Sequence, residues 1–396
     1  MDLDAVRAAL VPAGIDGWLL YDFRGSNPIA RKLVGWSERQ IGTRRWFYWI
    51  PAQGEPVGIV HAIEREALGA VPGRRLVYSS WRDLEAHLAA CLKGTKRVAM
   101  EYSPGAAIPY VSRVDAGTLE LVRSKGPEVV TSADLIQLFE ARWSPKQKAL
   151  HDRAARDTLL AKDEAFALIQ ARHAAALPVK ESEVQAFIQS RFEARGLTTD
   201  HPCIVAVNDH ASDPHFETAA GPGDRDVKKG DLVLIDLWAK VAGDDDGVYF
   251  DATWMAYCGD AIPPRIAEVW AAVSGARDAA VAFIEKAVAE KRTIRGADVD
   301  DVSRAFITQR GFGPQFLHRT GHSIGAEVHG NGVNIDNLET RDERTLIPGI
   351  CFSIEPGVYL PEFGIRSEID VYVGEGTVEV TGGPQGIQRE LTRLVP

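Results

Sequence analysis

The chain has 396 residues, of which 45% are hydrophobic and 25% are charged, a balance typical of a globular protein with room for two domains. The net charge of −10 argues against nucleic acid as a general partner. The start MDLDAVRAALVPAG does not resemble a signal peptide, and no stretch approaches roughly 18 uninterrupted apolar residues. We therefore expect neither secretion nor a membrane span.

Residues 1–140 alternate between short apolar runs and a helical pattern. Strands are predicted for DGWLLYDF and for RWFYWIP and PVGIVHAI, which flank the turn AQGEP. The next segments, RLVYSS, WRDLEAHLAACLKG and KRVAMEY, are typical of a strand, a helix and a strand. We therefore expect a compact α/β domain over residues 1–140.

Residues 141–396 are predicted to form a second domain that uses one plan twice. It begins with a long helix, for which Ser144 is the expected N-cap and Pro145 the first helical residue. Each half has two helices followed by a pair of strands, although the halves share little identity. The predicted helices are 147–176, 181–195, 263–290 and 297–310, and the predicted strands are 231–239, 247–257, 350–360 and 364–373.

Four carboxylates stand inside apolar strand sequence, two in each half. They are Asp236 in LVLIDLW, Asp251 in VYFDATW, Glu355 in CFSIEPG and Glu368 in IRSEIDVYV. An unpartnered carboxylate in a buried strand costs several kcal/mol. Any one of them could cap a turn or pair with an arginine or lysine, but the repeated layout favours a common partner.

Divalent cations fit that role. Two such ions carry enough charge to neutralise four carboxylates, and a single imidazole would complete one coordination sphere. Oxygen-rich sites with one nitrogen suit Mn²⁺, with Zn²⁺, Co²⁺ or Fe²⁺ able to substitute. No thiolate is needed, and the scattered cysteines are expected to be buried free thiols in a reducing cytoplasm. They are Cys91, Cys203, Cys258 and Cys351.

Three of the ten histidines stand in HRTGHSIGAEVHGN, residues 318–331. Their spacings of four and seven residues occur in a stretch too rich in glycine for a stable helix. Glycines let the backbone bend tightly, so we expect His318, His322 and His329 to share one pocket.

The alternation of side chains along a strand adds two neighbours to the carboxylates. Thr253 shares a face with Asp251, and Arg366 shares a face with Glu368. A hydroxyl thus lies beside one predicted ligand and a cation beside the other. The alternative explanations are β-propensity for Thr253 and a surface ion pair for Arg366.

At these residues the chain resembles the creatinase/prolidase/methionine aminopeptidase family of pita-bread dinuclear metallopeptidases, in its Xaa-Pro dipeptidase and aminopeptidase P branch. The match covers about residues 147–390, and the residues before it resemble the creatinase-like N-terminal domain of that branch. The resemblance implies an α+β fold in which a duplicated pita-bread catalytic domain occupies residues 141–396. The family's ordered ligand set falls on Asp236, Asp251, His322 in GHSIG, Glu355 in SIEPGVY and Glu368 in IRSEID.

The resemblance also implies how these residues would share two metal ions. Asp236 would bind one ion alone. His322 and Glu355 would complete the sphere of the other ion. Asp251 and Glu368 would bridge the two.

Further pocket residues follow from the same resemblance. His215, in DPHFETAAGPGD, matches a histidine that contacts the substrate, and His329, in EVHGNG, matches one that steadies the scissile carbonyl. His318 matches another pocket histidine. Arg366 matches the arginine beside the last glutamate, and Tyr359 an active-site tyrosine.

The sequence departs from the family pattern at three places. The usual Asp-x-Gly is Asp236-Leu237-Trp238, and the usual Asp-x-Thr-Arg ends in Trp254. The two aspartates are also farther apart than is common, with the extra residues in AGDDDG, a predicted solvated loop. No ligand is lost, and Trp238 and Trp254 are expected near the site, where they would alter the substrate range.

The expected activity is hydrolysis of Xaa-Pro dipeptides by a metal-bridging hydroxide, with Glu355 carrying the proton. Proline leaves no N–H at the scissile bond, so a site that reads the carbonyl is suited to it. The alternatives are an aminopeptidase P, which removes the residue before proline from longer peptides, and an inactive pita-bread binding module. By resemblance, a homodimer is expected.

Overall fold

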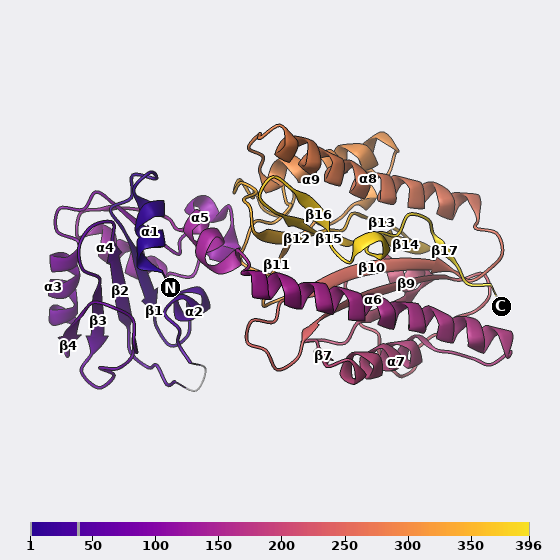
Figure 1. Ribbon diagram of the computed structural model, residues 1–396, viewed down its shortest axis with the longest axis horizontal. Coiled ribbons are helices and arrows are strands. Elements are labelled where there is room, and N and C mark those ends of the chain that lie inside the picture. Colours follow the sequence, from indigo (N-terminus) through magenta and orange to yellow (C-terminus); the bar gives the residue numbers. More distant parts are fainter. Residues whose placement is uncertain (1, 38–39, 396) are drawn as a thin grey trace. The chain divides into compact units, whose positions relative to one another are not determined.

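The computed structural model describes residues 2–37 and 40–395. The chain divides into two compact units, Met1–Glu140 and Ala141–Pro396 (Figure 1). Over the described residues, none of the helices joins the length to the apolar composition that crossing a bilayer requires. The cysteines are free thiols, as expected, and all but Cys91 are buried.

Unit 1 is built on a mixed sheet. Its strands are β1 Gly17–Asp22, β2 Trp46–Pro51, β3 Val57–His61, β4 Arg74–Tyr78, β5 Arg97–Met100 and β6 Glu128–Thr131, and its helices are α1 Leu3–Leu10, α2 Pro28–Leu33, α3 Trp81–Cys91, α4 Ala116–Arg123 and α5 Ala133–Ile136. The strand order is β4-β3-β2-β1-β5-β6. Trp18 and Leu20 pack on one face of the sheet and Leu19 and Tyr21 on the other, so helices cover both faces of an α/β domain.

A carboxyl group lies at the centre of unit 1. Glu101 is 0% exposed. Its Oε1 accepts hydrogen bonds from Trp18 Nε1 at 2.7 Å and Ser132 Oγ at 3.0 Å, and its Oε2 accepts one from Asn27 Nδ2 at 2.7 Å. Desolvation raises the pKa of Glu101 from 4.5 to about 7, although these hydrogen bonds lower it.

We expect Glu101 to make unit 1 less stable as the pH rises from 4.5 to 7. The unfolded chain releases this proton near pH 4.5, whereas the folded chain keeps it until about pH 7, so deprotonation favours the unfolded state across that window. The loss amounts to about 3 kcal/mol. Denaturant unfolding of the wild type and of Glu101→Gln measures it: the wild type should lose that much more stability than the variant, and equal pH slopes would contradict the assignment.

Unit 2 has two larger sheets, with a helix pair beside each, and a small two-stranded sheet. Its helices are α6 Pro145–Ala174, α7 Glu181–Ala194, α8 Pro264–Ala289 and α9 Gly296–Gln309, and its strands are β7 Leu197–Thr198, β8 Ile204–Val207, β9 Leu232–Val241, β10 Phe250–Tyr257, β11 Ser323–Ile324, β12 Ile350–Ile354, β13 Gly357–Leu360, β14 Phe363–Arg366, β15 Ile369–Val373, β16 Val378–Val380 and β17 Thr392–Arg393. One sheet has the order β17-β10-β9-β7, with β8 also on β9, and the other has the order β11-β12-β15-β16. Figure 1 shows α6 and α7 on one side of the strands and α8 and α9 on the other.

The long helix begins as the sequence predicts. Ser144 Oγ accepts from the Gln147 backbone N–H, the Gln147 side chain accepts from the Ser144 N–H, and Pro145 occupies the first turn. This capping box satisfies two amides that the helix leaves unbonded.

The second strand pair differs from the prediction. The segments expected as 350–360 and 364–373 each break in two, and β13 and β14 form a small sheet of their own. The first break falls at Glu355 and Pro356, where proline has no N–H for a ladder, and the second falls at Ser367 and Glu368. Both predicted glutamates therefore stand at strand ends.

Candidate metal centre and substrate pocket

Asp236 and Asp251 project from the face of β9 and β10 that is turned away from α6. The strands pair antiparallel, with Asp236 opposite Thr253. The alternate residues, Ile235 and Ala252 among them, belong to the apolar core that α6 covers. Because side chains alternate across a strand, burying one set against α6 turns both aspartates to the other face.

Glu355 and Glu368 stand at the ends of β12 and β15, next to residues 318–331, which carry three histidines and are called the histidine loop below. The Glu355 backbone N–H donates to Thr320 O at 2.7 Å. Ser353 Oγ accepts from the His322 N–H at 2.9 Å and donates to Glu355 Oε1 at 3.1 Å. Ser353 thereby ties the predicted imidazole ligand to one predicted carboxylate ligand.

The five predicted ligands come together. Asp251, His322 and Glu368 each offer an atom within 4.8 Å of the others. His322 Nε2 lies 3.3 Å from Glu355 Oε1 and 3.7 Å from Asp251 Oδ2. Asp236 joins the group through Arg366, whose Nη2 donates to Asp236 Oδ2.

Burial and mutual repulsion oppose the negative charges of the carboxylates in this group. Desolvation, and then repulsion from Asp236, raise the pKa of Asp251 well above its usual value. Desolvation and the charge of Asp251 do the same to Glu368, and desolvation raises the pKa of Glu355 to about 7. Desolvation lowers the pKa of His322, which keeps its imidazole neutral and able to act as a ligand.

These residues fit a pair of divalent metal ions. Asp236 Oδ1 and Asp251 Oδ1 are buried and have no hydrogen-bond partner among the described residues. An unpartnered buried carboxylate oxygen is costly, and coordination of a cation removes that cost. The donor set, four carboxylates and one imidazole, suits ions that prefer oxygen with some nitrogen.

Arg366 is buried among the carboxylates. It is 4% exposed, and its guanidinium donates to Thr253 Oγ1 at 3.0 Å, Tyr359 Oη at 3.1 Å and Asp236 Oδ2. Desolvation alone would lower its pKa, but the negative groups around it raise that pKa instead. Thr253 Oγ1 in turn donates to Glu368 Oε2 at 2.8 Å, so Arg366 reaches both halves of the site.

His318 and Tyr359 extend this network. His318 Nε2 lies 2.7 Å from Tyr359 Oη, and His318 Nδ1 lies 2.7 Å from Arg319 O. Desolvation, then the charge of Arg366, lower the pKa of His318 to about 3. The ring is therefore neutral, with Nδ1–H donating to the carbonyl and Nε2 accepting from the tyrosine hydroxyl.

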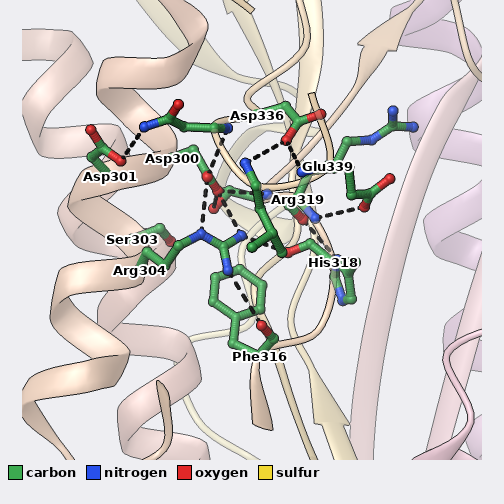
Figure 2. Close-up of polar contacts among 12 residues, drawn as sticks. Asp300, Asp301, Ser303, Arg304, Phe316, His318, Arg319, Asp336 and Glu339 are labelled. Atoms are coloured by element: carbon green, nitrogen blue, oxygen red, sulfur yellow. Dashed lines mark hydrogen bonds and ion pairs between the residues drawn. The ribbon is translucent and has the colours of Figure 1, made fainter. Parts of the chain in front are cut away.

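The loop that carries the histidines is held by two side chains of α9, which the sequence analysis did not single out. Asp300 is 0% exposed and accepts from the Thr320 N–H and Oγ1, the Asn337 N–H and the Arg304 guanidinium. Arg304 also donates to Phe316 O at 3.3 Å and His318 O at 2.6 Å. Figure 2 shows both side chains directed into the loop.

We expect Asp300→Ala to destabilise the protein by about 3 kcal/mol or more, because it leaves buried donors and the Arg304 cation without their acceptor. Activity should fall with it, since the histidine loop loses its anchor. Asp301→Ala is the matched control: this neighbour is exposed and makes one hydrogen bond to Asn337 Nδ2, so its effect should stay within about 0.5 kcal/mol. Denaturant unfolding compares the two, and equal losses of stability would rule out the anchoring role.

Gly321, in the middle of this loop, is required by close approach and not by a left-handed turn. A Cβ there would lie 1.9 Å from Ser353 O. Its φ is not positive, and neither are those of Gly325 and Gly330. Gly321 thus lets the loop pack against β12, and the expected bend of the backbone falls farther along, at residues 325–329.

His329 lies beside His322, and the exposed His215 is near enough for its charge to act on His329. The His329 ring centroid is 4.2 Å from that of His322 in an edge-to-face contact. His329 is exposed along one side although protein atoms surround most of its ring. Desolvation and Arg319 lower its pKa to about 4, with a smaller contribution from the exposed His215.

A second buried group lies behind Asp251. Asp370 Oδ2 accepts from the Asp251 backbone N–H at 2.9 Å, and Asp370, His151 and Cys351 offer atoms within 4.8 Å of one another. Both nitrogens of His151 already bond, to Tyr249 O and Thr381 Oγ1. Asp370 shares the strand face of Glu368, two residues away, which is the signal by which sequence reasoning could have found it.

The sequence model of metallopeptidase family M24 matches residues 149–375. The chain belongs to metallopeptidase family M24. The resemblance drawn from the sequence is thereby confirmed.

Individual relatives agree with the M24 assignment. An uncharacterized peptidase of Staphylococcus saprophyticus is 31% identical over 215 residues, which cover 52% of this chain and 54% of that protein. An Xaa-Pro dipeptidase of Lactobacillus delbrueckii subsp. lactis is 31% identical over 181 residues, 46% of this chain and 44% of that protein. The chain thus spans about half the length of the curated relatives it matches.

Solved structures extend the likeness in fold to the whole chain. Dipeptidase PepE from Mycobacterium ulcerans has a TM-score of 0.71 at 24% identity, covering 100% of this chain and 97% of that one. An Xaa-Pro dipeptidase from Bacillus anthracis has a TM-score of 0.63 at 21% identity, covering 99% and 98%. The predicted α+β pita-bread fold with its N-terminal domain is confirmed.

Two tryptophans distinguish this M24 chain, and only one of them lies near the centre. Trp254 is on the opposite face of β10 from Asp251. It is 9% exposed, belongs to the core under α6, and has Lys162 Nζ 3.5 Å from its ring centroid. Its expected place near the site is therefore wrong. Trp238 shares the face of Asp236.

The AGDDDG segment is a surface loop, as predicted. Lys146 Nζ lies 2.9 Å from Asp244 and 3.0 Å from Asp246; Lys146 and Asp246 are exposed, and Asp244 is partly exposed. Exposed ion pairs of this kind contribute little to stability. The insertion therefore lengthens the β9–β10 connection without adding a ligand to the centre.

Proposed function

We propose that this protein is a dinuclear metal-dependent peptidase that hydrolyses Xaa-Pro dipeptides. The observation that carries the proposal is the grouping of one neutral imidazole with four carboxylates, of which Asp236, Asp251 and Glu368 are buried and Glu355 is partly buried, with Asp236 Oδ1 and Asp251 Oδ1 left unpartnered. Within the described part of the chain no group donates a hydrogen bond to those oxygens, and two divalent cations would coordinate them.

The residues that would hold the ions follow from this arrangement and from the M24 pattern. Asp236 would bind one ion, and His322 with Glu355 the other. Asp251 and Glu368 would bridge them. Mn²⁺ is the proposed metal, with Zn²⁺, Co²⁺ or Fe²⁺ as substitutes. When bound, such ions supply Lewis-acid chemistry and make hydroxide available near neutral pH.

The side chains of the chain would move the proton and hold the substrate. Glu355 would take a proton from the attacking water and deliver it to the leaving nitrogen. His329, beside His322, would donate to the oxygen of the scissile carbonyl as negative charge develops there. His215, on the exposed side, would contact the substrate.

Arg366 and its neighbours would bind the C-terminal end of a dipeptide. A guanidinium has five N–H donors, and three of those of Arg366 go to Thr253, Tyr359 and Asp236. The others would bind a C-terminal carboxylate. Tyr359 and His318 would fix its orientation. The dipeptidase names of several relatives support this substrate size. A cytoplasmic homodimer is the proposed working form.

A substrate panel tests the proposal. The purified protein is stripped with a chelator, reloaded separately with Mn²⁺, Co²⁺ or Zn²⁺, and offered Ala-Pro, Ala-Ala and Ala-Pro-Ala-Ala. We expect Ala-Pro to be cut fastest, with Mn²⁺ the best metal. Preference for the tetrapeptide would make the protein an aminopeptidase P, and a protein that holds no more than traces of metal would be an inactive binding module.

A further inference from the structure

A carboxylate outside the metal ligands stands beside the centre. In the pairing of β7 with β9, Thr198 lies opposite Lys240. Continuing this antiparallel register brings Asp200 opposite Trp238, and the indole Nε1–H donates to Asp200 Oδ1 at 2.8 Å. Asp200 is therefore held in place by the Trp238 side chain.

The same register shows which part of the candidate centre lies next to the segment that carries Asp200. Trp238 is two residues from Asp236 on the same strand face, a step of about 7 Å. Ile204, at the other end of the 199–203 segment, lies opposite Asp236 itself. This segment thus borders the candidate centre. In a bound peptide, about 2.5 Å separates the terminal nitrogen from the first carbonyl carbon, so a group that binds this nitrogen must stand close to the residues that act on that carbonyl.

Asp200 is also charged and within reach of a ligand. Its side chain is 44% exposed, and its Oδ2 lies 3.3 Å from His201 Nδ1 on the solvent side. Desolvation raises its pKa, but hydrogen bonds from Trp238 and His201 outweigh this and lower it. Asp200 is also close enough to His329 for its charge to raise the pKa of that ring, and His329 in turn contacts His322.

We propose that Asp200, oriented by Trp238, binds the free α-ammonium group of the peptide substrate and so selects peptides with an unblocked amino terminus. This inference rests on the proposed peptidase function. It supplies the acidic contact that a dipeptide amine needs, at a residue that is not a metal ligand. A charge-assisted hydrogen bond of this kind is worth about a 10- to 100-fold change in affinity.

The test compares Ala-Pro and Ala-Ala with their Nα-acetyl forms on the metal-loaded wild type, Asp200→Asn and Trp238→Phe. For the free dipeptides, Asp200→Asn should raise KM about 10- to 100-fold with little change in kcat, and Trp238→Phe should raise it less. Rates on the acetyl peptides should not change, so the preference for a free amine shrinks. A structural role alone would lower both kinds of rate together. Asp246→Asn, in the exposed loop, is the matched control.

The outcomes separate this inference from the proposed function. Cleavage of Ala-Ala but not Ala-Pro would refute the proline preference while still testing Asp200. If neither dipeptide is cut, calorimetric titration with Ala-Pro is the readout: binding that requires the free amine and is lost in Asp200→Asn supports the role. An unchanged preference for the free amine in Asp200→Asn, or no binding to the wild type, would overturn it.

Discussion

Asp251→Asn is expected to lower kcat/KM for Ala-Pro by at least about 10³-fold, which corresponds to roughly 4 kcal/mol of transition-state stabilisation. Asp251 Oδ2 lies 3.7 Å from His322 Nε2, and Asp251 Oδ1 is one of the two ligand oxygens that have no hydrogen-bond partner among the described residues. The amide keeps the shape of the side chain but removes the charge that would bridge two ions. Initial rates with saturating Mn²⁺ measure the effect.

The same variant should behave in the opposite way without metal. Repulsion among the carboxylates raises the pKa of Asp251, so removing its charge should stabilise the metal-free protein while abolishing the stabilisation that Mn²⁺ gives the wild type. Asp246→Asn, on the exposed loop, should leave both properties unchanged. Wild-type rates in Asp251→Asn would remove this residue from the centre.

Arg366→Lys is expected to cost about 3 kcal/mol of stability in the metal-free protein and to lower kcat by about 10²-fold. Lysine cannot make the three contacts that the guanidinium makes to Thr253, Tyr359 and Asp236. Asp236 is then left buried without its cation. Added Mn²⁺ should restore part of the lost stability, because it gives Asp236 a new partner.

A matched surface substitution controls for the loss of an arginine. Arg265→Lys changes an exposed residue whose partner, Glu268, is exposed too, so its effect should stay within about 0.5 kcal/mol. Unfolding midpoints with and without metal, together with Ala-Pro kinetics, compare the two variants. If Arg366→Lys unfolds and turns over like Arg265→Lys, the buried network has no role in either property.

The candidate centre was predictable because strands repeat every second residue. Charged residues inside apolar strand sequence must find a partner, and the period places Asp251 beside Thr253. Arg366 was expected beside Glu368 by the same period, but the strand breaks between them, and Arg366 reaches the centre through Thr253 and Asp236. The same rule, applied to Trp254, would have placed it on the far face with Ala252. Trp254 was misplaced because proximity in sequence was taken for proximity in space.

Other features depend on tertiary contacts that no local pattern reveals. Asp300 is one acidic residue of an ordinary amphipathic helix in the sequence, and only folding brings Thr320 to it. Asp200 likewise comes next to Trp238 only through the register of β7 on β9. The strand break at Pro356 could have been predicted, because proline interrupts the hydrogen bonding between strands. The sequence around Ser367 contains no such signal for the second break.

The central claim is that four carboxylates, three of them buried, and one imidazole hold two cations, and counting the cations tests it most directly. The chelated protein is dialysed against Mn²⁺, and bound manganese per chain is measured by elemental analysis for the wild type and for Asp251→Asn. The account predicts two ions per wild-type chain and a marked loss in the variant. Less than one ion per wild-type chain, or full loading of the variant, would contradict it.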